Sequence, residues 1–270
     1  MDYKKITETP SNHENLELMD TRTILQKMNE EDQKVASAVK KTIPQVTKLV
    51  DELAKRFELG GRLFYIGAGT SGRLGILDAS EIPPTFGMPH DRVIGLIAGG
   101  DTAIRKAVEN AEDATKQAWV DLMAHDITKN DVVVGIAASG STPYVVGGLE
   151  DAKKNGIRTA AITNNPGAPI ARIADIPIEI NVGPEFLTGS TRMKSGTSQK
   201  LVLNMISTAL MIKIGRVKGN KMVNMQLSND KLVDRGTRYI MEGLNIDYKA
   251  AEKLLKEHGS VKLALDAGRA

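Results

Sequence analysis

Five short apolar runs recur through the middle of the chain, and most of them end in glycine or polar residues. Val, Ile, Leu and Ala dominate these runs, which are too short for buried helices and typical of buried strands. Helical patterns lie between them. Strands that alternate with helices predict an α/β fold, in which a parallel sheet carries helices on both faces. The five runs are RLFYIGAG (62–69), RVIGLIAGG (92–100), DVVVGIAASG (131–140), RTAAITNN (158–165) and IPIEINV (176–182).

Helical segments are expected on both sides of this sheet along the chain. Apolar residues within 21–57 recur at helical spacing, with Pro44 as a break or kink and Gly60-Gly61 as the end. The run LVLNMISTALMIKIG (201–215) is apolar on nearly every face, which predicts a helix buried in the core or in a subunit interface. We therefore expect three parts: an arm with helices over 1–60, an α/β domain over 61–225 and a small helical region over 226–270.

Residues 1–20 are polar and lack periodicity. Such a segment is ordinarily a flexible arm, and the other interpretation is an arm that wraps around a partner subunit. Both structures are compatible with the sequence.

The composition excludes several classes of protein and site. The 270 residues include no cysteine, which excludes disulfides, thiolate nucleophiles and cysteine-ligated metals. No apolar run is long enough to cross a bilayer, so we expect a cytoplasmic protein without a membrane partner. A net charge of +3 with 4% aromatic residues indicates small phosphorylated ligands rather than nucleic acid. The histidines lack metal-ligand spacing, and no metal site is expected at His13, His90, His125 or His258.

The segment GAGTSG (67–72) follows the first predicted strand and matches the dinucleotide fingerprint G-x-G-x-x-G. A dinucleotide site also needs an acidic residue about 20 positions further on, which binds the ribose. The second predicted strand ends in LIAGGD, and its acid, Asp101, lies too far along the chain. The fingerprint therefore indicates a phosphate-binding turn and not a nicotinamide or flavin site.

Two further segments carry hydroxyl groups at the predicted edge of the sheet. AASGST (137–142) repeats the strand, loop and helix pattern, and backbone N–H groups at a helix N-terminus bind phosphate. TGSTRMKSGTS (188–198) adds two cations to a dense set of hydroxyl residues. More ordinary roles exist for both: Ser141 and Thr142 as helix caps before Pro143, and the third segment as a solvated cap. The predicted ligand-binding residues are Gly69, Thr70, Ser71, Ser139, Gly140, Ser141, Thr142, Ser190, Arg192 and Lys194.

These loops resemble those of the sugar isomerase (SIS) domain, which binds phosphosugars. Within that superfamily the chain is similar to the N-acetylmuramic acid 6-phosphate etherases over roughly residues 20–260. The N-terminal TETPSNHENLELMD and the early C-terminal end differ from the family pattern. The similarity is carried by GAGTSGRLGILDASEIPPTFG (67–87), IAGGDTAIRKAVENAEDA (97–114), GIAASGSTPYVVGGLEDAKKNG (135–156) and GPEFLTGSTRMKSGTSQKLVLNMISTALMIKIG (183–215).

This family cleaves the D-lactyl ether of N-acetylmuramic acid 6-phosphate, giving N-acetylglucosamine 6-phosphate and D-lactate in cell-wall recycling. The resemblance implies a homodimer with sites near the subunit interface, and neither metal nor organic cofactor. It assigns the catalytic acid and base to Glu81 and Glu112.

The residues themselves bear on these two roles. Pro83 and Pro84 predict that the helix after GAGTSG ends at Glu81, where a negative charge opposes the helix dipole and suits a proton donor. Glu112 falls in the amphipathic stretch Ala103–Leu122, and the pattern by itself predicts an exposed helical residue there.

Two alternatives to an etherase share the fold. The first is a phosphosugar-binding regulator without catalytic activity, although no helix-turn-helix segment that would bind DNA is recognisable. The second is an aldose–ketose phosphate isomerase. Glu81 and Glu112 favour an enzyme over a regulator, and both carboxylates together with GSTRMKSGT (189–197) disfavour the isomerase.

Overall fold

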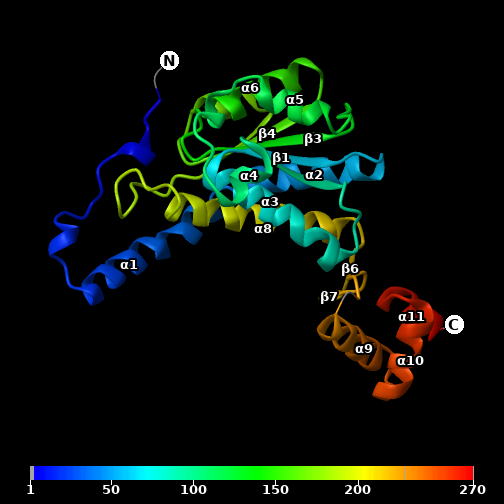
Figure 1. Cartoon of the computed structure of the whole chain (residues 1–270). Coiled ribbons are helices and arrows are strands. Elements are labelled where there is room, and N and C mark those ends of the chain that lie inside the picture. Colours follow the sequence, from blue (N-terminus) through cyan, green and yellow to red (C-terminus); the bar gives the residue numbers. More distant parts are fainter. Residues whose placement is uncertain (1–2, 228, 270) are drawn as a thin grey trace.

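A parallel sheet forms the centre of the protein, seen here in a computed structural model that describes residues 3–227 and 229–269. The strand order is β2-β1-β3-β4-β5, and all neighbouring strands run parallel. Figure 1 labels β1, β3 and β4 of this sheet. The predicted parallel α/β fold is therefore confirmed. The strands are β1 (Leu63–Gly67), β2 (Val93–Ile97), β3 (Val132–Ile136), β4 (Arg158–Thr163) and β5 (Ile176–Glu179).

Helices and 3-10 turns (η) cover both faces of this sheet and extend beyond it (Figure 1). Before β1 lie η1 (Ile6–Glu8), η2 (Leu16–Leu18), α1 (Thr21–Lys40) and α2 (Ile43–Glu58). The α/β part contains α3 (Gly69–Phe86), α4 (Gly100–Arg105), η3 (Ala111–Asp113), α5 (Gln117–Met123), α6 (Pro143–Lys154), α7 (Pro169–Ile173) and α8 (Lys194–Lys213). It is followed by β6 (Val217–Lys218), β7 (Lys221–Met222), α9 (Asp230–Leu244), α10 (Tyr248–His258) and α11 (Val261–Ala267). No helix within residues 3–227 and 229–269 is long and apolar enough to span a membrane.

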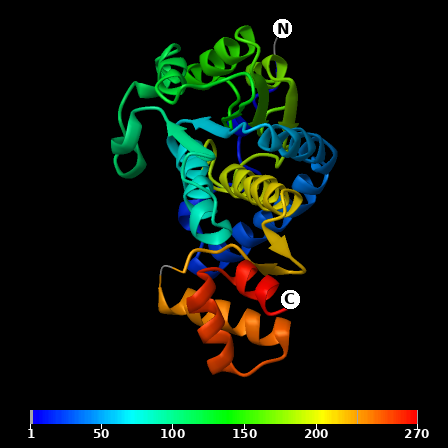
Figure 2. The same ribbon diagram turned by 90° about the vertical axis from the view of Figure 1, so that its right-hand side faces the viewer.

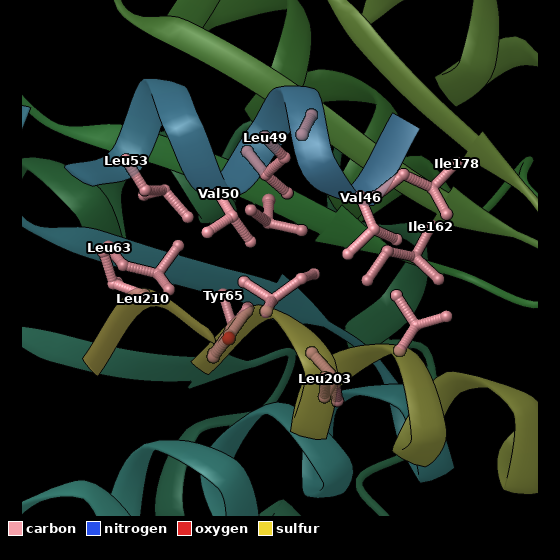
Figure 3. Packing of buried hydrophobic residues seen from close by; sticks show 14 of the residues in the cluster. Val46, Leu49, Val50, Leu53, Leu63, Tyr65, Ile162, Ile178, Leu203 and Leu210 are labelled. Atoms are coloured by element: carbon pink, nitrogen blue, oxygen red, sulfur yellow. The ribbon is translucent and has the colours of Figure 1, made fainter. Parts of the chain in front are cut away.

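One face of the sheet is covered by α2, α3 and α8. Leu63 and Tyr65 of β1 point to this face. Figure 3 shows them packed with Leu49 of α2 and Leu203 of α8. The apolar run at 201–215 therefore forms a core helix.

The opposite face is covered by α5, α6 and α7. It receives the alternate side chains of β1, Phe64 and Ile66, which pack with Tyr144 and Leu149 of α6. Because helices cover both faces, β1 and β3 are buried along their whole length, and their sequences are almost continuously apolar.

The order of the strands reverses at β1. The chain passes from β1 to β2 on one side and then places β3 on the other side. The carboxyl ends of β1 and β3 are therefore neighbours, with Gly67 paired to Ile136. Parallel sheets bind ligands beyond such a reversal, because the connections that leave it run to opposite faces.

Helix α3 continues through the two prolines, so the prediction that it ends at Glu81 is wrong. It runs to Phe86 and ends at Gly87, whose φ of 63° is left-handed and whose N–H donates to Pro83 O over 2.9 Å. Both prolines lie in the last turn, so the helix loses only the two hydrogen bonds that their N–H groups would donate to Ala79 O and Ser80 O. The burial of Ile82 and Phe86 in the core holds this turn in place.

The stretch Ala103–Leu122 is not one amphipathic helix. It divides into the end of α4, the turn η3 and most of α5. Gly147 of α6 explains the path between them, because a Cβ there would lie 1.9 Å from Thr115 O. The backbone of this loop thus lies directly on α6. Glu112 is exposed as predicted, but it belongs to a 3-10 turn rather than to a regular helix.

The N-terminal arm (residues 3–20) lies along one side of the molecule (Figure 1). Thr7 is only 1% exposed, and its backbone N–H donates to Asn165 Oδ1 over 3.0 Å. Residues 3–13 of the arm are therefore packed against their own chain, whereas residues 14–20 are mostly exposed.

The C-terminal helices α9, α10 and α11 pack around a small apolar core of their own (Figure 2). Ile240, Leu255 and Leu265 are buried in it. The segment before α9 contacts the end of α3, where Gln226 N donates to Pro84 O over 3.1 Å. The expected small helical appendage is therefore present.

A buried carboxyl group lies between α3 and α8. Asp78 is 4% exposed and accepts hydrogen bonds from Tyr65 OH and Ser207 Oγ, each over 3.1 Å. Burial raises the pKa of Asp78 to about 6, although both hydrogen bonds and the charge of Lys200 act in the opposite direction. The folded protein therefore holds a proton that the unfolded chain releases at lower pH.

We expect Asp78→Asn to stabilise the protein above about pH 6. The pKa of Asp78 is higher in the folded state, so the proton's stabilising contribution is complete below about pH 4 and lost as the pH rises through about 6. Asparagine stays neutral at every pH and should gain up to about 3 kcal/mol over the wild type at about pH 8. Urea unfolding across this range measures the gain.

The exposed aspartate variant Asp91→Asn is the control, for which we expect no comparable gain. A stability difference between Asp78→Asn and the wild type that does not change with pH would contradict the raised pKa.

Candidate functional site

The turn after β1 leads into the first turn of α3, which contains Gly69, Thr70 and Ser71. A Cβ at Gly72 would lie 2.6 Å from Ile97 Cγ1, so the last glycine of the fingerprint lets α3 pack closely on the sheet. The N-terminus of α3 therefore lies at the sheet edge, where its backbone N–H groups and its dipole favour an anion.

The two hydroxyl side chains of this turn lie toward α8. Ser71 is buried and donates to Gln199 Oε1 over 2.9 Å. Thr70 is half-buried beside the first turn of α8, where a Cβ at Gly196 would lie 3.4 Å from its Cγ2. The hydroxyl of Ser71 is thus bonded within the protein interior.

The second loop joins β3 to α6. Gly140 has a φ of 70°, and a Cβ there would lie 2.3 Å from Ala168 Cβ, so only glycine fits. The hydroxyl of Ser139 accepts from Ser141 N over 3.3 Å. Thr142 is the N-cap residue of α6, but within the described chain its side chain makes no capping hydrogen bond. The more ordinary role of Thr142 as a side-chain cap is therefore not adopted.

In the third segment, TGSTRMKSGTS (188–198), a carboxylate of the protein itself binds the helix N-terminus. The buried Glu185 accepts from the backbone N–H groups of Lys194 and Ser195, each over 2.9 Å, and from Ser195 Oγ over 2.7 Å. These are the first residues of α8, so Glu185 occupies the position that a phosphate would take at this helix N-terminus. Ser190 is half-buried and Arg192 exposed in the loop before it.

The ammonium group of Lys194 points into the protein. Lys194 is 1% exposed and donates to Glu31 Oε2 over 2.5 Å, which links α8 to α1. Glu31 Oε1 also contacts Lys34 Nζ over 2.6 Å and His13 Nε2 over 3.1 Å. Burial alone would raise the pKa of Glu31, but the hydrogen bonds from Lys194, Lys34 and His13 outweigh it and lower that pKa to about 2.

Glu112 lines a cavity of about 230 Å³ that also contains Gly69 at the start of α3. Arg73 lines the same cavity, and its Nε donates to Ile104 O over 2.8 Å. Glu112, the predicted base, therefore lies beside the first loop, GAGTSG (67–72), and Arg73 adds a cation there. The sequence motifs do not single out Arg73, although an arginine directly after GAGTSG was the available signal.

Glu81 lies apart from this cavity. It is exposed and lines a second cavity with Asn229, Lys231 and Arg235 from the C-terminal part. The helical rise of 1.5 Å per residue places it about 18 Å along α3 from Gly69. Within one chain the two predicted catalytic carboxylates therefore do not meet. The sequence motifs do not single out Lys231 and Arg235 of α9. Charged residues on an amphipathic helix are usually solvated, so neither residue stands out.

Two asparagines at the carboxyl end of β4 connect the three segments. Asn164 Nδ2 donates to Ser198 Oγ over 2.8 Å, and Asn164 Oδ1 accepts from Gln199 Nε2 over 3.2 Å. Asn165 Nδ2 donates to Ser139 O over 3.1 Å. The motifs do not single out these residues, and two consecutive asparagines directly after a predicted strand were the available signal.

Comparisons with known domains and structures agree with this architecture. A family model of the SIS domain matches residues 104–209, and that of the glucokinase regulatory protein N-terminal SIS domain matches residues 45–153. A phosphoheptose isomerase from Neisseria gonorrhoeae has a TM-score of 0.54 at 18% identity, over 70% of this chain and 97% of that one. A putative sugar-phosphate isomerase from Listeria monocytogenes has a TM-score of 0.52 at 20% identity, over 72% and 92%. At these identities the likeness supports the fold alone.

Full-length relatives are much more similar. A protein of Christiangramia forsetii is 66% identical over 261 residues, which cover 97% of this chain and 95% of the relative. One of Bacteroides thetaiotaomicron is 61% identical over 269 residues (100% and 97%), and one of Salmonella agona is 54% identical over 242 residues (90% and 82%). All three are named N-acetylmuramic acid 6-phosphate etherase. The chain therefore belongs to the N-acetylmuramic acid 6-phosphate etherase family.

Proposed function

We propose that this protein is a carbon–oxygen lyase that cleaves the D-lactyl ether of N-acetylmuramic acid 6-phosphate in peptidoglycan recycling. The products are N-acetylglucosamine 6-phosphate and D-lactate. The observation that carries the proposal is the 66% identity to an etherase over 97% of the chain. The meeting of two helix N-termini, those of α3 and α6, at the reversal of the sheet supports a phosphorylated substrate.

The phosphosugar is proposed to bind between the starts of α3 and α6 and the loop before α8. Ser71 and Lys194 support the binding loops from the interior of the protein. Ser71 is bonded to Gln199, and Lys194 is bonded to Glu31. The residues proposed to face the substrate are Gly69, Thr70, Ser139, Gly140, Ser141, Thr142, Ser190 and Arg192.

The proposed reaction is an elimination followed by addition of water. Ring opening exposes an aldehyde at C1, which makes the proton at C2 acidic. Glu112 removes this proton, and Glu81 protonates the ether oxygen as the C3–O bond breaks and D-lactate leaves. Water then adds to C3 of the unsaturated aldehyde while a proton returns to C2. These steps are proton transfers that require no metal or organic cofactor.

We also propose a homodimer in which Glu81 of one subunit approaches Glu112 of the partner subunit. The support is that these carboxylates line different cavities in one chain. Exposed apolar side chains on α1, α2 and α8, namely Leu25, Ile43 and Ile212, supply surface that a second copy would bury.

We propose a cytoplasmic protein whose substrate is a small charged solute and that binds neither membranes nor nucleic acid. A net charge of only +3 with 4% aromatic residues supports the absence of nucleic-acid binding. Residues 61–225 form its phosphosugar-binding domain, with helical parts over 1–60 and 226–270 on either side.

Incubation with N-acetylmuramic acid 6-phosphate should release D-lactate and N-acetylglucosamine 6-phosphate in equal amounts. In heavy water the product should carry deuterium at C2 and nowhere else on the ring, because C2 exchanges its proton with solvent. An enzymatic lactate assay and proton NMR measure both results. Phosphosugar binding without lactate would favour the regulator, and a product without deuterium at C2 would contradict elimination.

Glu81→Gln and Glu112→Gln should each reduce kcat by at least about 100-fold, because each variant lacks one proton-transfer group. Their Kd for N-acetylglucosamine 6-phosphate, measured by calorimetry, should stay near the wild-type value. Glu109→Gln is the matched control, since Glu109 lines the same cavity as Glu112 without a proposed role. Full activity in either catalytic variant would remove that residue from the mechanism.

A mixed dimer tests which subunit supplies each carboxylate. Co-expression of Glu81→Gln and Glu112→Gln chains with different affinity tags yields a heterodimer in which one shared site keeps both carboxylates. Its activity should be about half that of the wild-type dimer, because a two-fold dimer has two equivalent sites. An inactive heterodimer would show that both carboxylates act from one subunit.

A further inference from the structure

The N-terminal arm is bonded to the loop between β3 and α6. Thr7 and Asn165 form a reciprocal pair: Thr7 N donates to Asn165 Oδ1, and Asn165 Nδ2 donates to Thr7 Oγ1, each over 3.0 Å. Asn165 Nδ2 also donates to Ser139 O over 3.1 Å. An amide has two N–H groups, so Thr7 and Ser139 together use both. Tyr3 OH adds a second hydrogen bond to Ser139 O over 3.3 Å.

The same arm is bonded to the loop before α8. Ser11 Oγ donates to Phe186 O over 2.7 Å, and Ser11 N donates to Thr188 Oγ1 over 2.9 Å. The ring of His13 lies 5.2 Å from that of Phe186, centre to centre. Residues 3–13 therefore connect two loops that are about 50 positions apart in the sequence and that both carry proposed substrate-binding hydroxyls.

The hydrogen bonds between Thr7 and Asn165 are shielded from water. Thr7 is 1% exposed and Asn165 is 0% exposed, so water does not replace a hydrogen bond lost between them. Without Thr7 Oγ1, one N–H of Asn165 is left without its acceptor. The amide then satisfies that N–H only by turning, which removes its own hydrogen bond to the carbonyl of Ser139 and leaves that carbonyl with the longer bond from Tyr3 OH.

We propose that residues 3–13 are a positioning segment of the phosphosugar site and that Thr7 is its central positioning residue. The proposal rests on the proposed function for the identity of the ligand. The arm holds the two loops in their binding geometry before the ligand arrives, so the ligand does not have to order them. Thr7 acts through Asn165 and Ser139 and takes no part in proton transfer, so its loss weakens binding more than chemistry.

The test compares Thr7→Val, which removes only the hydroxyl, with Thr7→Ser, which keeps it. Thr159→Val is the matched control: Thr159 is 0% exposed, lies at the opposite end of β4, and its hydroxyl donates to Asp175 Oδ2 over 3.1 Å. The measurements are Kd for N-acetylglucosamine 6-phosphate, KM and kcat for the etherase substrate, and Tm.

In Thr7→Val we expect Kd and KM to rise about tenfold, the cost of one unsatisfied buried donor, with kcat within about twofold of the wild type. Thr7→Ser should restore Kd to within about twofold of the wild-type value. Thr159→Val should lower Tm to a similar extent but leave Kd unchanged.

Ser11→Ala keeps the test open if Thr7→Val does not fold, because Ser11 is only half-buried and its hydroxyl makes one of the two hydrogen bonds that join it to the loop before α8. We expect it to raise Kd several-fold. Wild-type Kd values in the folded variants would overturn the proposal and make the arm a packing element only. Since Kd is measured without turnover, a protein that binds the phosphosugar but releases no lactate would contradict the proposed function and leave this test valid.

Discussion

The carboxylate of Glu185 determines what the rest of the site is able to do. It accepts the backbone N–H groups of Lys194 and Ser195 at the start of α8, so the positive end of that helix dipole is already neutralised. For the proposed anionic ligand this leaves the N-termini of α3 and α6, which follow the adjacent strands β1 and β3. The hydroxyl-rich segment before α8 becomes the side wall of the site, and its geometry is set by contacts inside the protein.

Those contacts form a buried polar network that ties α3, β4 and α8 together. The hydroxyl of Ser71 donates to Gln199, whose amide donates to Asn164, whose amide in turn donates to Ser198. Each group is buried, so each bond specifies an orientation that an apolar contact would leave open. The ion pair between Glu31 and Lys194 attaches α1 to the same place. The loops around the candidate site thus rest on a frame whose members come from widely separated parts of the sequence.

This separation explains which features could be predicted from the sequence. Buried parallel strands are apolar on both faces, so local pattern alone locates them, and glycines mark the turns that follow. The passage of α3 through Pro83 depends on core packing of its last turn, which no local pattern encodes. Similarly, the motif-rich segments indicate the correct sheet edge, but the inward direction of Lys194 depends on Glu31, a residue of a different helix. The wide spacing of Glu81 and Glu112 also follows from three-dimensional paths rather than from either motif.

The contact between Thr7 and Asn165 spans 158 positions in the chain, and this has a consequence for biosynthesis. At a synthesis rate of 5–20 residues per second, the arm leaves the ribosome roughly 8 to 30 s before its partner. Until then Ser139 lacks the hydrogen bond from the Asn165 amide, although Tyr3, which also donates to its carbonyl, has already been made. The buried pair that holds the proposed positioning segment therefore forms only after β4 has been synthesised.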